Sequence, residues 1–308
     1  MTAVDCMRRV HTLCTLSRAN FRALKKGMYP EIDTLPKQHT PSLQGGIVDF
    51  SRDMHIHPFE KGRTREAMDA FVLSALEQGF RTIAFTDHAP MAAECRAKHV
   101  MSLEEMEGYV RYAGDLQKVY ERDIRILIGI EADHHPLNCS MVEHLRKTYK
   151  PDLIIGALHL NTPAWEEAVS GLGPEEVCNF AFDRTLDLVS SGLYDVLAHI
   201  DRFVQVLYRL GYAFIPSQWK HRYLEVFRML EIHNVILELN MNGYNTPSGL
   251  PLENCAEMLL WSKPYKIAYT LSSDAHWPKD IGRLFPELRK LLCMRGIIDE
   301  GIEGEVRG

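Results

Sequence analysis

Seven short apolar runs, each followed by a longer stretch with helical character, occupy most of this chain and limit the folds it can adopt. The runs lie at residues 47–56, 82–86, 124–130, 153–158, 196–200, 235–239 and 267–271. The helical stretches lie at 64–79, 103–121, 139–148, 175–191, 217–233, 251–262 and 283–294. This alternation predicts a parallel sheet with right-handed crossovers. Seven successive units favour closure into an α/β barrel, with an open doubly wound sheet as the alternative.

The chain is expected to have two parts. Residues 28–46 contain three prolines and two glycines with little periodicity, so residues 1–46 are interpreted as an N-terminal helix and a linker. Residues 47–308 form the predicted barrel domain. A chain of 308 residues, 46% of them hydrophobic, is long enough to bury the core of one such barrel.

The overall charge argues against a nucleic-acid-binding surface. The formal net charge is −6 at pH 7, whereas nucleic-acid-binding proteins usually carry a strongly basic face. The seven cysteines are scattered and none is spaced as Cys-x-x-Cys, so neither a disulfide framework nor a zinc ribbon is expected. No apolar run approaches the roughly 18 residues needed to span a bilayer. We therefore expect a cytoplasmic protein with no membrane and no nucleic-acid partner.

Metal-binding residue types recur where the apolar runs end. The segments are Asp-Met-His-Ile-His at 53–57, Thr-Asp-His at 86–88, Gly-Ile-Glu at 129–131, Ala-Leu-His at 157–159, Leu-Ala-His at 197–199 and Ser-Asp-Ala-His at 273–276. A lone histidine at a strand end is usually structural. Six histidines that all stand where an apolar run ends indicate a shared function instead. Because the loops that follow the strands of a barrel meet at one face, these residues predict a metal site assembled from the whole chain.

The spacing of these residues suits more than one cation. His55 and His57 are two positions apart, so both imidazoles point to the same side of an extended strand, and Asp274 and His276 repeat that geometry at the last strand. Glu131 supplies a carboxylate that can bridge two ions. Mixed nitrogen and oxygen ligands suit Zn²⁺, Mn²⁺ or Fe²⁺, and two or more ions a few Å apart suit hydrolysis of phosphate esters.

In combination these segments resemble the PHP (polymerase and histidinol phosphatase) superfamily, and most closely its histidinol-phosphatase branch. The resemblance covers about residues 47–295 and includes the segments 85–90, 129–133, 198–201 and 238–243. It implies a distorted (β/α)7 barrel, similar to a TIM barrel, with two or three divalent ions. The implied ligands are His55, His57, His88, Glu131, His159, His199, Asp274 and His276, of which His199, Asp274 and His276 are also assigned catalytic roles.

The chain departs from the family pattern in three places. A further histidine that the family carries soon after His-x-His is missing from residues 58–62, where Glu60 is a candidate replacement ligand. The branch's two phosphate-binding arginines are also absent, and Asn161 and Asn245 stand near those positions as candidate substrate contacts. Arg202 is the best remaining phosphate contact, since a guanidinium can bind phosphate through two hydrogen bonds. His134 is a further candidate for contact with substrate.

The sequence thus predicts a metal-dependent phosphatase that hydrolyses a small phosphomonoester with metal-activated water. One alternative is a metal-dependent hydrolase of a phosphodiester, a cyclic phosphate, or a non-phosphate ester or amide. A second is a non-catalytic PHP-like module. His135, beside His134, could likewise touch substrate or metal. The other histidines lie away from strand ends and are expected to be structural or solvated; they are His11, His39, His99, His144, His221 and His233.

Overall fold

The computed structural model describes residues 48–60, 63–95, 97 and 99–298, so the predicted N-terminal helix and linker lie outside the described residues. Seven strands pair in chain order. They are β1 (Arg52–Ile56), β2 (Thr82–Phe85), β3 (Arg125–Asp133), β4 (Leu153–Ala157), β5 (Val196–Leu197), β6 (Ile236–Asn240) and β7 (Tyr269–Ser272). Every neighbouring pair is parallel, which confirms the predicted (β/α)7 arrangement.

The first and last strands meet and bring the sheet to a nearly closed barrel. Ile56 and Ala275 form a parallel bridge, beside which the backbone N–H of His57 donates to the Ala275 carbonyl at 2.8 Å. The buried Asp53 carboxylate accepts two further hydrogen bonds, from the backbone N–H groups of Ser273 at 2.9 Å and Gly282 at 3.1 Å. We call this junction the β1–β7 seam. It excludes the open doubly wound alternative, in which the edge strands do not meet.

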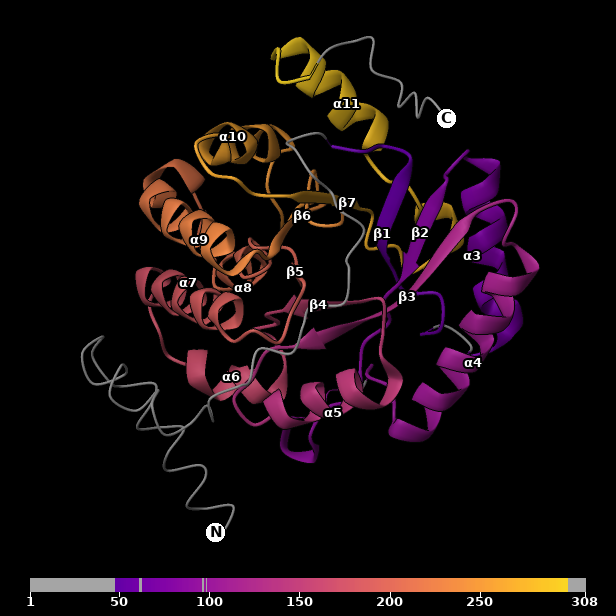
Figure 1. Cartoon of the computed structure of the whole chain (residues 1–308). Helices are drawn as coiled ribbons and strands as arrows, with labels where there is room; N and C mark the ends of the chain where they lie inside the picture. Colours follow the sequence, from indigo (N-terminus) through magenta and orange to yellow (C-terminus); the bar gives the residue numbers. More distant parts are fainter. Residues whose placement is uncertain (1–47, 61–62, 96, 98, 299–308) are drawn as a thin grey trace.

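Helices surround the strands as an outer ring (Figure 1). They are α3 (Arg65–Glu77), α4 (Leu103–Val119), α5 (Cys139–Tyr149), α6 (Pro163–Val169), α7 (Pro174–Ser190), α8 (Val204–Arg209), α9 (Lys220–His233), α10 (Glu253–Ser262) and α11 (Phe285–Met294). The described residues also form three short 3-10 helices: η1 (Ala93–Cys95), η2 (Pro216–Trp219) and η3 (Pro278–Asp280). Among the described residues, no helix combines the length and the apolar character required to cross a bilayer.

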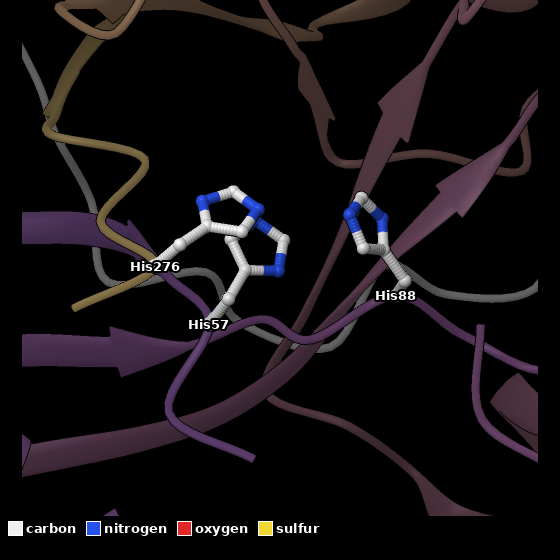
Figure 2. Close-up of side chains that lie close together, drawn as sticks. All are labelled: His57, His88 and His276. Atoms are coloured by element: carbon white, nitrogen blue, oxygen red, sulfur yellow. The ribbon is translucent and has the colours of Figure 1, made fainter. Parts of the chain in front are cut away.

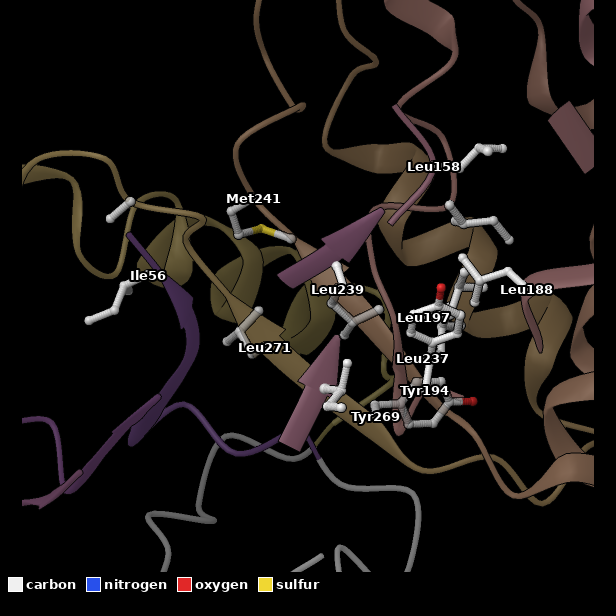
Figure 3. Packing of buried hydrophobic residues seen from close by; sticks show 14 of the residues in the cluster. Ile56, Leu158, Leu188, Tyr194, Leu197, Leu237, Leu239, Met241, Tyr269 and Leu271 are labelled. Atoms are coloured by element: carbon white, nitrogen blue, oxygen red, sulfur yellow. The ribbon is translucent and has the colours of Figure 1, made fainter. Parts of the chain in front are cut away.

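The strands bury apolar side chains on both faces. One set lines the barrel interior and consists of Met54, Ala84, Leu127, Leu153, Ile155, Ala157, Val196 and Ala198. The larger set fills the space between strands and helices and includes Leu237, Leu239 and Leu271 (Figure 3). Burial of both faces explains why the strands read as nearly continuous apolar runs.

The interior changes from apolar to polar towards the carboxyl ends of the strands. On β4, Leu153, Ile155 and Ala157 share the interior face, and His159 continues the same two-residue period just beyond the strand. Glu131 follows Leu127 on β3 by the same rule. The period of the strand therefore sends ligand-type side chains into the mouth of the barrel, above its apolar floor.

Candidate metal centre

Four side chains from three strands form a first cluster, which consists of His55, His57, Glu131 and Asp274. His57 Nε2 lies 3.0 Å from His55 Nε2 and 3.1 Å from Asp274 Oδ1. Glu131 Oε2 lies 3.5 Å from His55 Nε2 and 3.7 Å from His57 Nε2. His55 Nε2 lies 4.0 Å from Asp274 Oδ1. Ligand atoms about 2.0–2.2 Å from a tetrahedral ion are roughly 3.3–3.6 Å apart, so these nitrogen and oxygen atoms are close enough together to hold one cation.

A second cluster shares Glu131 with the first and adds His159 and His199. The other carboxylate oxygen, Oε1, lies 2.9 Å from His199 Nε2 and 3.6 Å from His159 Nε2. All three residues are buried, and their donor atoms lie within 4.8 Å of one another. The two oxygens of Glu131 thus face two neighbouring sets of nitrogen ligands, which is the arrangement of a carboxylate that bridges two cations.

Buried carboxylates orient the ligand imidazoles from behind. Glu238 Oε1 lies 2.7 Å from His55 Nδ1, and Asp133 Oδ1 lies 2.8 Å from His159 Nδ1. A carboxylate on Nδ1 fixes the proton there and leaves Nε2 free to bind an ion. Glu238 also accepts a hydrogen bond from the backbone N–H of His199 at 2.7 Å through Oε2, so one side chain aligns parts of both clusters.

The electrostatics of the two clusters favour positive charge. Burial alone would raise the pKa of Glu131, but His88, His55 and His159 outweigh it and hold that pKa well below its ordinary value. Burial opposes the charged form of His159 as well, yet Asp133 and Glu131 raise its pKa to about 9. The carboxylates are therefore ionised and stabilise any cation beside them, which agrees with the donor spacing.

A third group consists of His57, His88 and His276, whose donor atoms also lie within 4.8 Å of one another (Figure 2). The rings of His57 and His276 stack with their centroids 4.2 Å apart, and His88 approaches His57 from the segment after β2 at 4.4 Å. Glu60 joins this group, because its Oε2 lies 3.3 Å from His276 Nε2. The structure thus places Glu60 beside a predicted ligand.

The loop that carries Glu60 is held in place by Asp87. The backbone N–H of Phe59 lies 3.1 Å from each Asp87 oxygen, and the N–H of Glu60 donates to Oδ1 at 2.8 Å. Burial raises the pKa of Asp87 to about 7, against the opposing effect of these hydrogen bonds. The side chain that precedes His88 therefore fixes the loop that follows β1.

Of the predicted substrate contacts, Arg202 lies beside the candidate ligands. Arg202 lies in the turn after β5 and, with His199 and Asn240, lines a pocket beside the second cluster. Its positive charge opposes that of His159 and lowers the pKa of that imidazole. Among the described residues its buried Nε atom has no hydrogen-bond partner.

The other three candidates are not brought to the clusters in the same way. Asn161 is exposed in the turn after β4. Asn245 has a left-handed backbone (φ 53°), and its side-chain oxygen accepts a hydrogen bond from the N–H of Leu252, so it stabilises the loop after β6. His134 points outward from β3, where its Nδ1 lies 3.3 Å from the Tyr194 hydroxyl.

Sequence reasoning missed three groups at this mouth. Glu238 and Asp133 orient ligands, and their two-residue spacing from Asn240 and Glu131 was the available signal. His99 was expected to be structural or solvated, but its ring lies 4.4 Å from that of His88. It comes from a loop rather than a strand end, so no periodic signal marks it.

The chain matches known proteins along most of its length. The PHP domain family matches residues 53–242. The probable histidinol-phosphatase of Deinococcus radiodurans is 24% identical over 256 residues, which cover 77% of this chain and 91% of that protein. The histidinol-phosphatase of Bacillus subtilis is 25% identical over 258 residues, which cover 75% of this chain and 95% of that one.

A solved structure shares the fold. The histidinol phosphate phosphatase of Lactococcus lactis, complexed with zinc, L-histidinol and phosphate, has a TM-score of 0.63 at 19% identity and covers 79% of this chain and 94% of its own. The family match spans more than half of the chain. The chain therefore belongs to the PHP domain family, in its histidinol-phosphatase-like branch.

Proposed function

We propose that this chain is a metal-dependent phosphatase that hydrolyses a small phosphomonoester. The observation that carries the proposal is Glu131, whose two oxygens face two clusters of nitrogen ligands. Two cations a few Å apart are the arrangement that suits in-line displacement at phosphorus. The relatives named histidinol-phosphatase support a phosphomonoester as the substrate class.

Each residue has a separate task in this reaction. His55, His57, Glu131 and Asp274 would hold one cation, and Glu131, His159 and His199 would hold the other. When bound, Zn²⁺, Mn²⁺ or Fe²⁺ at these places would supply polarisation of the phosphoryl oxygens and a water molecule that is nucleophilic near neutral pH. Because His199 Nε2 points at Glu131, we assign His199 to cation binding in preference to proton donation.

Arg202 is the proposed phosphate contact. Asn161 and Asn245 carry no charge, whereas Arg202 lines the pocket beside His199 with a buried Nε free of hydrogen bonds among the described residues. A guanidinium at this place can offset the charge of a phosphate dianion. Histidinol phosphate is the first ester to assay, because the Lactococcus lactis relative was solved with L-histidinol and phosphate.

Asp274→Asn tests the first cluster. Asp274 has a left-handed backbone (φ 51°), which asparagine tolerates at least as well as aspartate, so this substitution removes the charge with little backbone strain. We expect loss of bound metal by elemental analysis and loss of nearly all hydrolysis, with an unchanged circular dichroism spectrum. His276→Ala, in the third group, should likewise lower bound metal and remove nearly all hydrolysis. Full activity with unchanged metal content in either variant would refute the assignment.

We further propose a third cation, held by His88, His276 and Glu60. The carboxylate of Glu60 is 15% exposed and lies beside His276 Nε2, while Asp87 fixes its backbone. An oxygen ligand here shifts the preference from Zn²⁺ towards harder ions such as Mn²⁺.

Substitution of Glu60 tests the third cation. Glu60→Gln should lower the metal content by about one ion per chain, and Glu60→His should restore it with more zinc. The matched control is Glu104→Gln, at an exposed glutamate in the first turn of α4. Equal metal content in Glu60→Gln and the control, measured without added metal, would remove Glu60 from the ligand set.

A further inference from the structure

His99 occupies a position at the mouth of the barrel that neither the family resemblance nor the strand pattern assigns. Its half-buried ring makes an edge contact with His88 at a centroid distance of 4.4 Å, and it lies 6.4 Å from the ring of His159. It therefore spans the gap between the third group and the second cluster. Among the described residues, the three sets of donor atoms that fit within 4.8 Å do not include His99.

The segment that carries His99 is anchored on both sides of it. Met91, Cys95, Ala97 and Val100 form a small buried apolar cluster against Leu137, from the β3–α5 connection. Two backbone hydrogen bonds add to this, from Met101 N–H to the His88 carbonyl at 3.1 Å and from Ala92 N–H to the Asn138 side chain at 2.9 Å. The packed residues Ala97 and Val100 thus restrict the backbone near His99, whose ring lies beside that of His88.

His99 and Arg202 come from different loops. The ring centroid of His99, in the β2–α4 connection, lies 6.4 Å from that of His159, and the charge of Arg202, in the turn after β5, lowers the pKa of His159. A phosphate at the second cluster would have the guanidinium and the imidazole as its neighbours. A neutral imidazole offers one N–H, which can donate to a phosphoryl oxygen that no cation occupies.

We propose that His99 is a substrate-contact residue that donates a hydrogen bond to the phosphate bound at the second cluster. This inference rests on the proposed phosphatase function for the identity of the anion. His99 then contributes to the affinity for phosphate and does not bind a metal ion. A charge-assisted hydrogen bond of this kind is stronger than one between neutral groups.

The test is binding of inorganic phosphate to the metal-loaded full chain, measured by calorimetry. His99→Ala should weaken phosphate binding about tenfold, as expected for a lost hydrogen bond to a charged acceptor. His99→Asn, which keeps an N–H donor, should recover part of the affinity. His144→Ala, at an exposed histidine on α5, is the control and should bind phosphate as the parent chain does. Metal content is measured for every variant and should not change.

The outcomes separate this inference from the proposed function. Phosphate affinity of His99→Ala within twofold of the parent would overturn the contact, and so would a fall in metal content, which would make His99 a ligand. A parent chain that binds phosphate but hydrolyses no phosphomonoester would refute the phosphatase and leave the contact of His99 intact. A metal-loaded parent that binds no phosphate would refute both.

Discussion

At the scale of single residues, Arg202 is the proposed contact for the phosphate group. Asn161 and Asn245, which stand near the branch's arginine positions, carry no charge and cannot neutralise a phosphate dianion. The side-chain oxygen of Asn245 also accepts a hydrogen bond from the backbone N–H of Leu252. Arg202 lies at the pocket that His199 and Asn240 line. A charged donor next to the second cluster would bind the transferred phosphoryl group in the ground state and in the transition state alike.

Arg202→Ala should lower kcat/KM on the best phosphomonoester by a factor that corresponds to a loss of about 2–4 kcal/mol of transition-state stabilisation. This is the free energy expected for the loss of a charge-assisted contact made through two hydrogen bonds. Arg202→Lys keeps the charge but not the planar fork, so it should recover only part of the loss. Steady-state kinetics on both variants measure the effect, and Arg209→Ala, at an exposed arginine in the last turn of α8, is the control. A change below threefold in Arg202→Ala would exclude the contact.

Individual residues were predictable where strand period decided their direction. The spacing of His55 and His57 required only that the pair follow one extended strand. Asp274 and His276 were expected to do the same, but they lie beyond the end of β7 and Asp274 has a left-handed backbone; the structure nevertheless brings Asp274 to His57. His134 was predicted to reach substrate, but it is one position out of phase with Asp133 and faces Tyr194. His99 could not be predicted, because tertiary packing of a loop sets its position.

At the scale of helices and strands, long periodic segments were predictable and short ones were not. The helices α3, α4, α5, α7 and α10 begin and end within two residues of the predicted bounds. The predicted strand at 196–200 is only Val196–Leu197, because the chain turns at His199, whose carbonyl accepts a hydrogen bond from Arg202 N–H at 2.9 Å. The short helices α6 and α8 were not predicted, since one or two turns give too little period to detect.

Packing between strands and helices restricts β4 to a glycine at position 156. A Cβ there would lie 2.5 Å from Tyr194 Cγ and 2.9 Å from Leu188 Cδ2, both buried core groups. Gly156→Ala should therefore lower the free energy of unfolding by about 1–3 kcal/mol, as overpacked cores do, in urea unfolding. Gly114→Ala is the contrast, because that helical glycine has nothing within 4 Å and should stabilise the chain by about 1 kcal/mol. Equal stability of the two variants would contradict the packing account.

At the scale of the whole molecule, the candidate metal centre is also a candidate source of stability. Its ligands come from the ends of β1, β2, β3, β4, β5 and β7, so bound cations would tie together six of the seven strands. Without cations, the carboxylates of Glu131 and Asp274 depend on histidines to balance their charge. The barrel was predictable from seven βα units, and so was the ability of the Glu131 carboxylate to bridge two ions. Which histidines lie at each of its oxygens was not predictable, because that depends on the exact placement of separate strands.

Removal of metal should lower the stability of the entire barrel. If the free cation is about 1,000-fold above its Kd, binding contributes about 4 kcal/mol, so chelation should lower the melting temperature by on the order of 10 °C. Calorimetry before and after EDTA treatment measures this, and added Zn²⁺ or Mn²⁺ should reverse it. Asp274→Asn should respond less to EDTA than the parent chain. An identical melting temperature with and without EDTA would show that the clusters contribute no binding energy to folding.

The β1–β7 seam has a consequence for the order of assembly. Its hydrogen bond from Ser273 N–H to the Asp53 carboxylate joins residues 220 positions apart, and the first cluster draws His55 and Asp274 from the same two ends. Contacts of such high sequence separation form late, because the intervening chain must be ordered before they are made. A partly synthesised chain that lacks β7 also lacks Asp274 and so cannot complete the first cluster. We therefore expect a cation to bind there only at the last stage of folding, after the whole barrel has been made.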